Sequence, residues 1–154
     1  GEIIERNNGR LDKFIGDGIM AIFDGSEDIN INCKNSLKAS AEISRSIKKL
    51  NSDMKSDFNE VLRFGIGIHV GNTIVGMMGY GKTVTETVVG DNVNIASRLE
   101  ELNKTYKSEL IISKEVAENA KLNLKQFKSN LVKIRGRKED LEILVLENAS
   151  NLSL

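Results

Sequence analysis

A lysine and an aspartate lie four residues apart in the segment RLDKFIGDGIMAIF, residues 10–23. Two short apolar runs flank Asp17 and its neighbouring glycines. This pattern predicts a β-hairpin, because glycine accepts the positive φ that a tight turn requires. Asp17 would then hold its carboxylate at an exposed tip supported by stiff strands, a good position for binding a cation. The simpler interpretation is that Asp17 only forms the turn.

The position of Lys13 is unusual for a charged residue. Side chains alternate along a strand, so Lys13 is expected on one face with Leu11 and Ile15, and Asp12 and Phe14 on the other. A lysine on an apolar face often marks a functional site. The alternative is that its aliphatic stem packs on this face while the amine extends into solvent.

A second polar pair follows a glycine in TVVGDNVNIASR, residues 87–98. Asp91 can cap a helix that runs to about Tyr106, with Val93, Ala96, Leu99 and Leu102 facing inward. Asn94 and Arg98 are four residues apart and therefore share one outward face. An amide and a guanidinium in this arrangement could hold a ribose and a phosphate. An ordinary solvated helix face is the alternative.

Residues 76–83 match G-x-x-x-x-G-K-[ST], the phosphate-binding P-loop. That loop requires a helix that begins at Lys82 and Thr83, because the free amides of the helix hold the phosphates. Six of the seven residues from 83 to 89 are β-branched, which favours a strand. We therefore reject a P-loop.

The other elements alternate without a strict βαβ repeat, which predicts an α+β fold. Helices are expected at residues 2–7, 32–54, 91–106 and 114–122, the last capped by Ser113. Strands are expected at residues 61–70, 110–113, 131–135 and 141–147, and residues 71–90 form a long hairpin or arm. The second helix should bury Ser36, Ser40, Ile43, Ile47, Leu50 and Met54. One domain is expected over residues 1–148, with a tail at 149–154.

Composition excludes several classes of protein. The 154 residues carry 22 basic and 22 acidic side chains, so no net charge favours nucleic acid as a partner. The one cysteine, Cys33, excludes an internal disulfide and suits a reducing, cytoplasmic setting. No apolar run is long enough to span a bilayer. Cys33 is expected to be a small buried residue, and His69 to serve packing or a dimer contact.

Four segments in this order resemble the catalytic domain of the class III adenylate and guanylate cyclases: DKFIGDGIMAIF, GIGIHVGNTIVGMMG, TVVGDNVNIASRLEEL and LVKIRGRKEDLEILVL. The resemblance covers nearly the whole chain. It implies a ferredoxin-like α+β fold, with helices packed on a mostly antiparallel sheet. It also implies a homodimer with composite active sites, in which residues 71–90 pack across the dimer.

The resemblance also implies roles at matching positions. Asp17 matches the second of two aspartates that hold two divalent cations, Mg²⁺ or Mn²⁺. One cation activates the ribose 3′-hydroxyl of ATP for attack on the α-phosphate, and the other steadies the departing pyrophosphate. Lys13 matches the lysine that reads adenine; it only donates hydrogen bonds, which suits the N1 acceptor of adenine. Thr87 matches the second base-reading position.

Three further positions complete the implied site. Asn94 would orient the ribose, and Arg98 would stabilise charge on the α-phosphate in the transition state. Arg137 lies near the position where the family has a basic residue that binds the triphosphate, although Arg135 and Lys138 compete for that role. In the dimer, Asp17 of one chain would work with Lys13, Asn94 and Arg98 of the other.

One departure from the family pattern limits these expectations. Nothing before Asp17 resembles the F-x-D-I-x-x-F strand that carries the first metal aspartate. We expect the chain to lack the opening strand and helix of the family, and the 154 residues alone to be inactive or nearly so. A parent protein is expected to add a sensor or membrane region, and such a strand upstream of Gly1 would restore the enzyme. There are two alternatives. The first is a guanylate cyclase, which Lys13 disfavours. The second is a non-catalytic dimerisation or nucleotide-sensing module.

Overall fold

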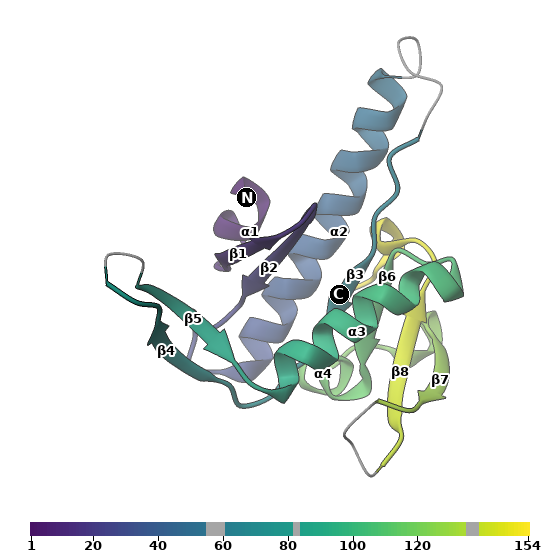
Figure 1. Ribbon diagram of the computed structural model, residues 1–154. Helices are drawn as coiled ribbons and strands as arrows, with labels where there is room; N and C mark the ends of the chain where they lie inside the picture. Colours follow the sequence, from purple (N-terminus) through teal and green to yellow (C-terminus); the bar gives the residue numbers. More distant parts are fainter. Residues whose placement is uncertain (55–60, 82–83, 135–138) are drawn as a thin grey trace.

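A four-stranded sheet forms the centre of the computed structural model (Figure 1), which describes residues 1–54, 61–81, 84–134 and 139–154. Its strands run in the order β3, β6, β8, β7. Their bounds are Ile66–Ile68 for β3, Leu110–Ser113 for β6, Leu141–Leu146 for β8 and Lys128–Val132 for β7. The β3–β6 pair is parallel and the other two pairs are antiparallel. The predicted α+β class with a mostly antiparallel sheet is confirmed.

Helices cover both faces of this sheet. On one face, Leu110 and Ile112 pack with residues of α2 (Ile29–Asp53) and α4 (Lys114–Asn119). On the other face, Ile111 and Ile143 pack with α3 (Asp91–Tyr106). Because strand side chains alternate between faces, β6 must be apolar at successive positions to fill both layers. This requirement explains the run Leu-Ile-Ile in β6 and the apolar content of β8.

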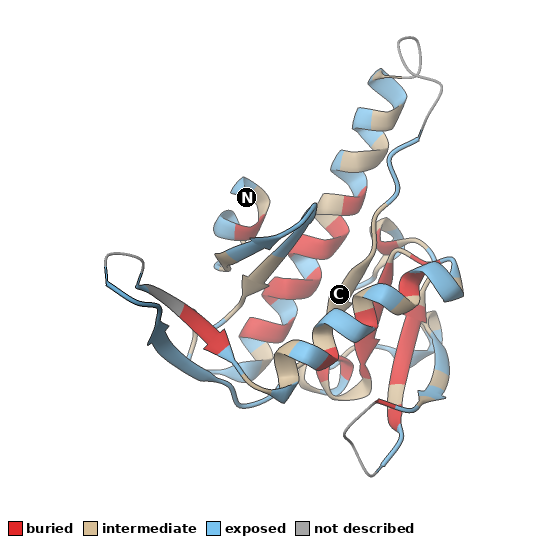
Figure 2. Ribbon diagram, viewed as in Figure 1, coloured by how far each residue is buried: buried red, intermediate tan, exposed pale blue. Residues whose placement is uncertain are grey.

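Helix α2 begins earlier than predicted, and the predicted inward stripe is fully buried only in its first part. The Asp28 carboxylate caps it by accepting a hydrogen bond from the Asn30 amide at 2.8 Å, so the helix starts at Ile29 rather than at residue 32. Ser36 and Ser40 are buried as expected. Leu50 is 44% exposed, however, because the last turns of α2 extend beyond the sheet (Figure 2). The buried residues of α2 are Asn32, Cys33, Asn35, Ser36, Leu37, Ala39, Ser40, Ala41 and Ser44.

Strand β3 is shorter than the predicted strand at residues 61–70, because only Ile66–Ile68 pair with β6. Leu62 lies outside the sheet, where its amide donates to Oδ1 of Asn51 on α2 at 2.9 Å. The glycine-bearing face of the segment packs directly under α3. A Cβ atom on Gly67 would lie 2.3 Å from backbone atoms of Ala96 and Glu100, so only glycine allows this close approach.

Two hairpins stand beside the central sheet. The first joins β1 (Arg10–Ile15) to β2 (Gly18–Ile22), and α1 (Glu2–Arg6) precedes it. The second joins β4 (Ile74–Met78) to β5 (Thr85–Val89) and extends away from the body as an arm (Figure 1). Both hairpins were predicted, and both are confirmed.

The segment after the P-loop-like motif is extended. Lys82 and Thr83 lie outside the described residues, but Thr85–Val89 forms strand β5, as predicted. The predicted strand at residues 131–135 begins and ends earlier than expected, as β7. Ser113 occupies the N-cap position of α4 without capping it, because its hydroxyl is hydrogen-bonded to Nδ1 of His69 at 2.8 Å.

The last residues of the chain pack on α2. The 3₁₀-helix η2 (Ala149–Asn151) buries Ala149 completely, and the Glu109 carboxylate accepts hydrogen bonds from the Ala149 amide at 2.9 Å and the Ser44 hydroxyl at 2.6 Å. A second 3₁₀-helix, η1, covers Leu124–Gln126. Within the described parts of the chain, no helix is both long and apolar enough to cross a membrane.

Candidate functional site

Lys13 and Thr87 are far apart in the sequence and in contact in the fold. The Nζ atom of Lys13 on β1 donates a hydrogen bond to Oγ1 of Thr87 on β5. The Lys13 side chain is 41% exposed, whereas Thr87 is 6% exposed. The two residues that the sequence assigned to reading a base therefore form one polar cluster, with the lysine at the solvent boundary and the threonine beneath it.

The predicted alternation of β1 is wrong, because the strand contains a β-bulge. Leu11 pairs with Ala21 and Lys13 pairs with Met20, which leaves Asp12 as an extra residue. Cross-strand partners share a face, and Met20 and Ala21 point to opposite faces. Lys13 therefore does not share a face with Leu11.

The bulge turns Asp12 toward Lys13 instead of away from it. Oδ2 of Asp12 lies 3.1 Å from Nζ of Lys13 and accepts a hydrogen bond from the Thr87 hydroxyl at 3.5 Å. The Asp12 side chain is only 1% exposed. Its other oxygen, Oδ1, is buried and has no hydrogen-bond partner among the described residues. The cluster thus has three members, to which we refer as the Asp12–Lys13–Thr87 cluster.

Asp12 is the member of this cluster that the sequence did not identify. A two-residue period assigns it to the opposite face, and the letters of the segment give no sign of an inserted residue. The one available signal was its position directly before a lysine that already looked misplaced.

Asn94 and Arg98 lie on the exposed face of α3, as predicted. Nη1 of Arg98 donates to Oε2 of Glu101 at 2.7 Å, and both side chains are more than half exposed. Within the described residues, no hydrogen bond joins Asn94 or Arg98 to Lys13 or Thr87. Gly90, with φ of 151°, connects β5 directly to α3, so the strand that carries Thr87 leads into the helix that carries Arg98.

His69 holds the first turn of that helix. Its Nε2 atom is 3.1 Å from Oδ1 of Asn92, and its Nδ1 atom is 2.8 Å from Oγ of Ser113. The Asn92 amide in turn donates to the Asn72 carbonyl oxygen at 2.6 Å. His69 therefore links the end of β3 and the start of α4 to α3.

Asp17 occupies the turn of the first hairpin and is exposed. Gly16 beside it has φ of 61°, the conformation for which glycine was expected. No group of three or more histidine, cysteine, aspartate or glutamate residues that could hold a metal ion occurs in the described part of the chain. The three predicted candidates for triphosphate binding, Arg135, Arg137 and Lys138, lie outside the described residues.

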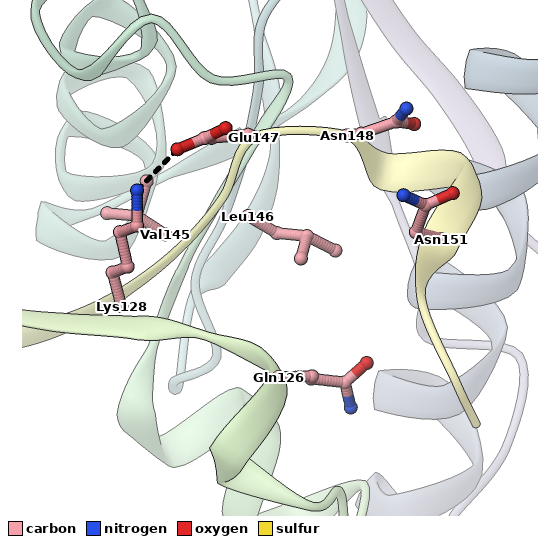
Figure 3. A pocket seen from close by; sticks show the side chains of 7 residues that line it. All are labelled: Gln126, Lys128, Val145, Leu146, Glu147, Asn148 and Asn151. Carbon is pink, nitrogen blue, oxygen red and sulfur yellow. Dashed lines mark hydrogen bonds and ion pairs between the residues drawn. The ribbon is translucent and has the colours of Figure 1, made fainter.

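A surface pocket beside β7 and the end of β8 contains none of the predicted site residues (Figure 3). Its lining residues are Gln126, Lys128, Val145, Leu146, Glu147, Asn148 and Asn151. Lys128 and Glu147 form an ion pair at its rim, and this pair lowers the pKa of the glutamate. Nothing in this lining suggests the recognition of a base or a phosphate chain.

Comparison with known proteins places these residues in context. The profile of the adenylate and guanylate cyclase catalytic domain matches residues 2–148. An adenylate cyclase of Anabaena cylindrica is 34% identical over 151 residues, which cover 93% of this chain and 29% of the relative. The terminal-differentiation specific adenylate cyclase of Dictyostelium discoideum is 35% identical over 150 residues, covering 91% of this chain and 7% of that protein. The chain thus spans less than a third of the length of either relative.

The same likeness extends to three dimensions. The crystal structure of the guanylyl cyclase Cya2 superposes with a TM-score of 0.79 at 25% identity, covering 94% of this chain and 72% of that chain. The set of similar proteins therefore includes both adenylate and guanylate cyclases, and the choice between the two bases depends on the residues of this chain.

Proposed function

The chain belongs to the adenylate and guanylate cyclase catalytic domain family, and from this premise we propose that it converts ATP to cyclic AMP and pyrophosphate. The contact between Lys13 and Thr87 carries the proposal. A lysine can only donate hydrogen bonds, and N1 of adenine can only accept one, whereas N1 of guanine carries a proton and donates. A lysine in the base-reading cluster therefore favours ATP. Two adenylate cyclases similar to this chain support the same choice.

Asn94 and Arg98 are proposed to act on the other end of the nucleotide. In the reaction the ribose 3′-hydroxyl loses its proton to solvent and its oxygen forms a bond to the α-phosphorus. The bond from that phosphorus to the bridging oxygen breaks, which releases pyrophosphate. Asn94 holds the ribose so that its 3′-oxygen faces the phosphorus. Arg98 exchanges its ion pair with Glu101 for the α-phosphate, where negative charge increases in the transition state.

Asp17 is proposed to contribute one carboxylate to a Mg²⁺ or Mn²⁺ ion. Cyclase catalytic domains generally use divalent cations, and Mg²⁺ is commonly held by one or two carboxylates together with substrate phosphates. A single exposed carboxylate does not make a complete two-cation site, and the described residues of one chain offer no cluster of ligands beside it. In this proposal Asp17 therefore supplies one ligand to the cation and takes no other part in the reaction.

A homodimer with composite sites accounts for the separation of these residues. Cyclase domains generally act as dimers, and the arm exposes large apolar side chains that are suited to contact with a second copy. They are Ile74, Val75, Met77, Met78, Tyr80, Val84 and Val89. In this arrangement Asp17 of one chain faces the Asp12–Lys13–Thr87 cluster, Asn94 and Arg98 of the other.

Turnover of ATP and GTP by the whole protein that carries this sequence tests the proposal. We expect cyclic AMP from ATP, at least tenfold lower kcat/KM for GTP, and loss of this preference in Lys13→Ala. Equal turnover of the two nucleotides would overturn the adenylate assignment. Nucleotide binding without any cyclic product would instead favour a non-catalytic sensing module.

A further inference from the structure

We propose that Asp12 determines the choice of base, by fixing which hydrogen-bonding groups Lys13 and Thr87 present. This inference rests on the proposed function, since it assumes that the cluster reads the purine of the substrate. Asp12 does not contact the base in this proposal. It acts as a positioning residue through its two neighbours in the cluster.

The hydroxyl of Thr87 shows how this works. A threonine hydroxyl has one proton to donate and two lone pairs that accept. Asp12 Oδ2 receives the proton at 3.5 Å, and Lys13 Nζ occupies one lone pair. One lone pair remains, so Thr87 presents an acceptor and not a donor.

The ammonium group of Lys13 is used in a similar way. Of its three N–H groups, one faces Oδ2 of Asp12 at 3.1 Å and one is donated to Thr87. The third remains and presents a donor. The cluster therefore offers an acceptor at Thr87 beside a donor at Lys13. The edge of adenine carries the complementary pair, the 6-amino donor and the N1 acceptor, whereas guanine and hypoxanthine carry a 6-carbonyl acceptor and an N1 donor.

The surroundings of Asp12 suit this role better than a purely structural one. Its side chain is 1% exposed, and Oδ1 is buried with no partner among the described residues. A buried acceptor without a partner destabilises a fold, so a neutral or apolar residue would serve packing better. Unlike such a residue, a carboxylate accepts hydrogen bonds and donates none. The proton of the Thr87 hydroxyl must therefore point toward Asp12 and away from the base.

The substitution Asp12→Asn separates this property from shape. The side chain keeps its size, but its amide can donate to Thr87, and the hydroxyl is then free to donate to a 6-carbonyl group. We compare kcat/KM for ATP and for inosine triphosphate (ITP), whose base differs from adenine only at the 6-position and N1. The wild-type protein should prefer ATP, and the ratio of ATP to ITP should fall about tenfold in Asp12→Asn, as expected for one misdirected hydrogen bond.

Matched variants show whether the effect passes through Thr87. Asp24→Asn removes another carboxylate near the same hairpin, one that pairs with Arg10 at 3.0 Å, and should leave the ratio unchanged. Thr87→Val should lower the ratio, and Asp12→Asn should lower it no further in the Thr87→Val background. Thr87→Ser, which keeps the hydroxyl, should retain the wild-type ratio.

The ATP-to-ITP ratios distinguish a failure of the inference about Asp12 from a failure of the proposed function. Because both substrates are compared on one preparation, the ratio does not depend on the folded fraction of a variant. If Asp12→Asn keeps the wild-type ratio while Thr87→Val lowers it, Asp12 has no part in the choice of base and the inference is wrong. If the wild-type protein itself fails to prefer ATP, the proposed function is wrong, whatever the variants do.

Discussion

Gly67 of β3 and Ala96 of α3 touch without a side chain between them: a Cβ atom on Gly67 would lie 2.3 Å from the Ala96 carbonyl oxygen. The same atom would be equally close to the amide nitrogen of Glu100. Both neighbours are backbone atoms, which cannot rotate away as the end of a side chain can. The position of α3, and with it that of Asn94 and Arg98, therefore depends on the absence of a single methyl group.

We predict that Gly67→Ala destabilises the domain strongly, by about 3 kcal/mol or more, since α3 must shift to admit the methyl group. Gly76→Ala on the arm is the matched control, because a Cβ atom there meets nothing within 4 Å. Urea unfolding of the two variants measures the difference. Similar free energies of unfolding for both would show that α3 accommodates the methyl group without cost.

Arg98 can be tested separately from the stability of α3. Because Arg98 and Glu101 form an exposed ion pair, Arg98→Ala should leave the Tm nearly unchanged. The same variant should lower kcat about 100-fold or more, as loss of a transition-state donor does. Glu101→Gln breaks the same ion pair and should keep most of the activity. A comparable loss in both variants would contradict a direct role for Arg98.

The thiol of Cys33 should be unreactive in the folded protein. Burial raises its pKa from 9.0 to about 11, which lowers the thiolate fraction near pH 8 roughly 100-fold. A thiol reagent such as dithionitrobenzoate should therefore label native protein at least that much more slowly than urea-unfolded protein. Rapid labelling of the native chain would mean that the start of α2 opens readily.

The raised pKa of Cys33 also makes the free energy of unfolding depend on pH in the alkaline range. Below pH 9 the thiol is protonated in both states and the shift has no effect. Between about pH 9 and 11 the unfolded chain loses this proton first, so the free energy of unfolding falls as the pH rises. Comparing wild type with Cys33→Ala at pH 8 and pH 10.5 isolates the contribution, because the variant should lack this part of the loss.

Self-association should depend on the arm. Met77 lies near the end of β4, toward the tip of the arm, and is 68% exposed. Leu131 on β7 is exposed to the same extent. We predict that Met77→Glu raises the dimer dissociation constant at least tenfold, because the charge would be buried in the contact. Leu131→Glu should not change it. Sedimentation equilibrium measures both constants, and an equal effect of the two substitutions would place the contact elsewhere.

Local sequence patterns correctly predicted the elements whose conformation depends on neighbouring residues. The hairpin turn depends on Gly16 beside Asp17, and the arm on its β-branched residues, so short-range sequence was sufficient for both. The contact between Lys13 and Thr87 came from the family resemblance, because nothing in either segment alone indicates that the two meet.

The errors have one common cause, since each depends on what the rest of the fold provides. The predicted inward stripe on α2 continues through Leu50 to Met54, because helical periodicity does not show where the supporting sheet ends. Ser113 is a favourable capping residue, yet His69, distant in sequence, engages its hydroxyl. The face of Lys13 was assigned wrongly because one inserted residue leaves the hydrophobic pattern almost unchanged.

The bulge at Asp12 also has a consequence for protein engineering. Deleting this one residue would restore a continuous ladder in which Leu11 still pairs with Ala21 and Lys13 with Met20, so the lysine would keep its face. The ribbon would lose the buried carboxylate that lies 3.1 Å from the ammonium of the lysine, together with the local twist that the bulge adds. In this hairpin a single inserted residue therefore adds a negative charge to the proposed base-reading cluster, at a point where a regular ladder has no position for it.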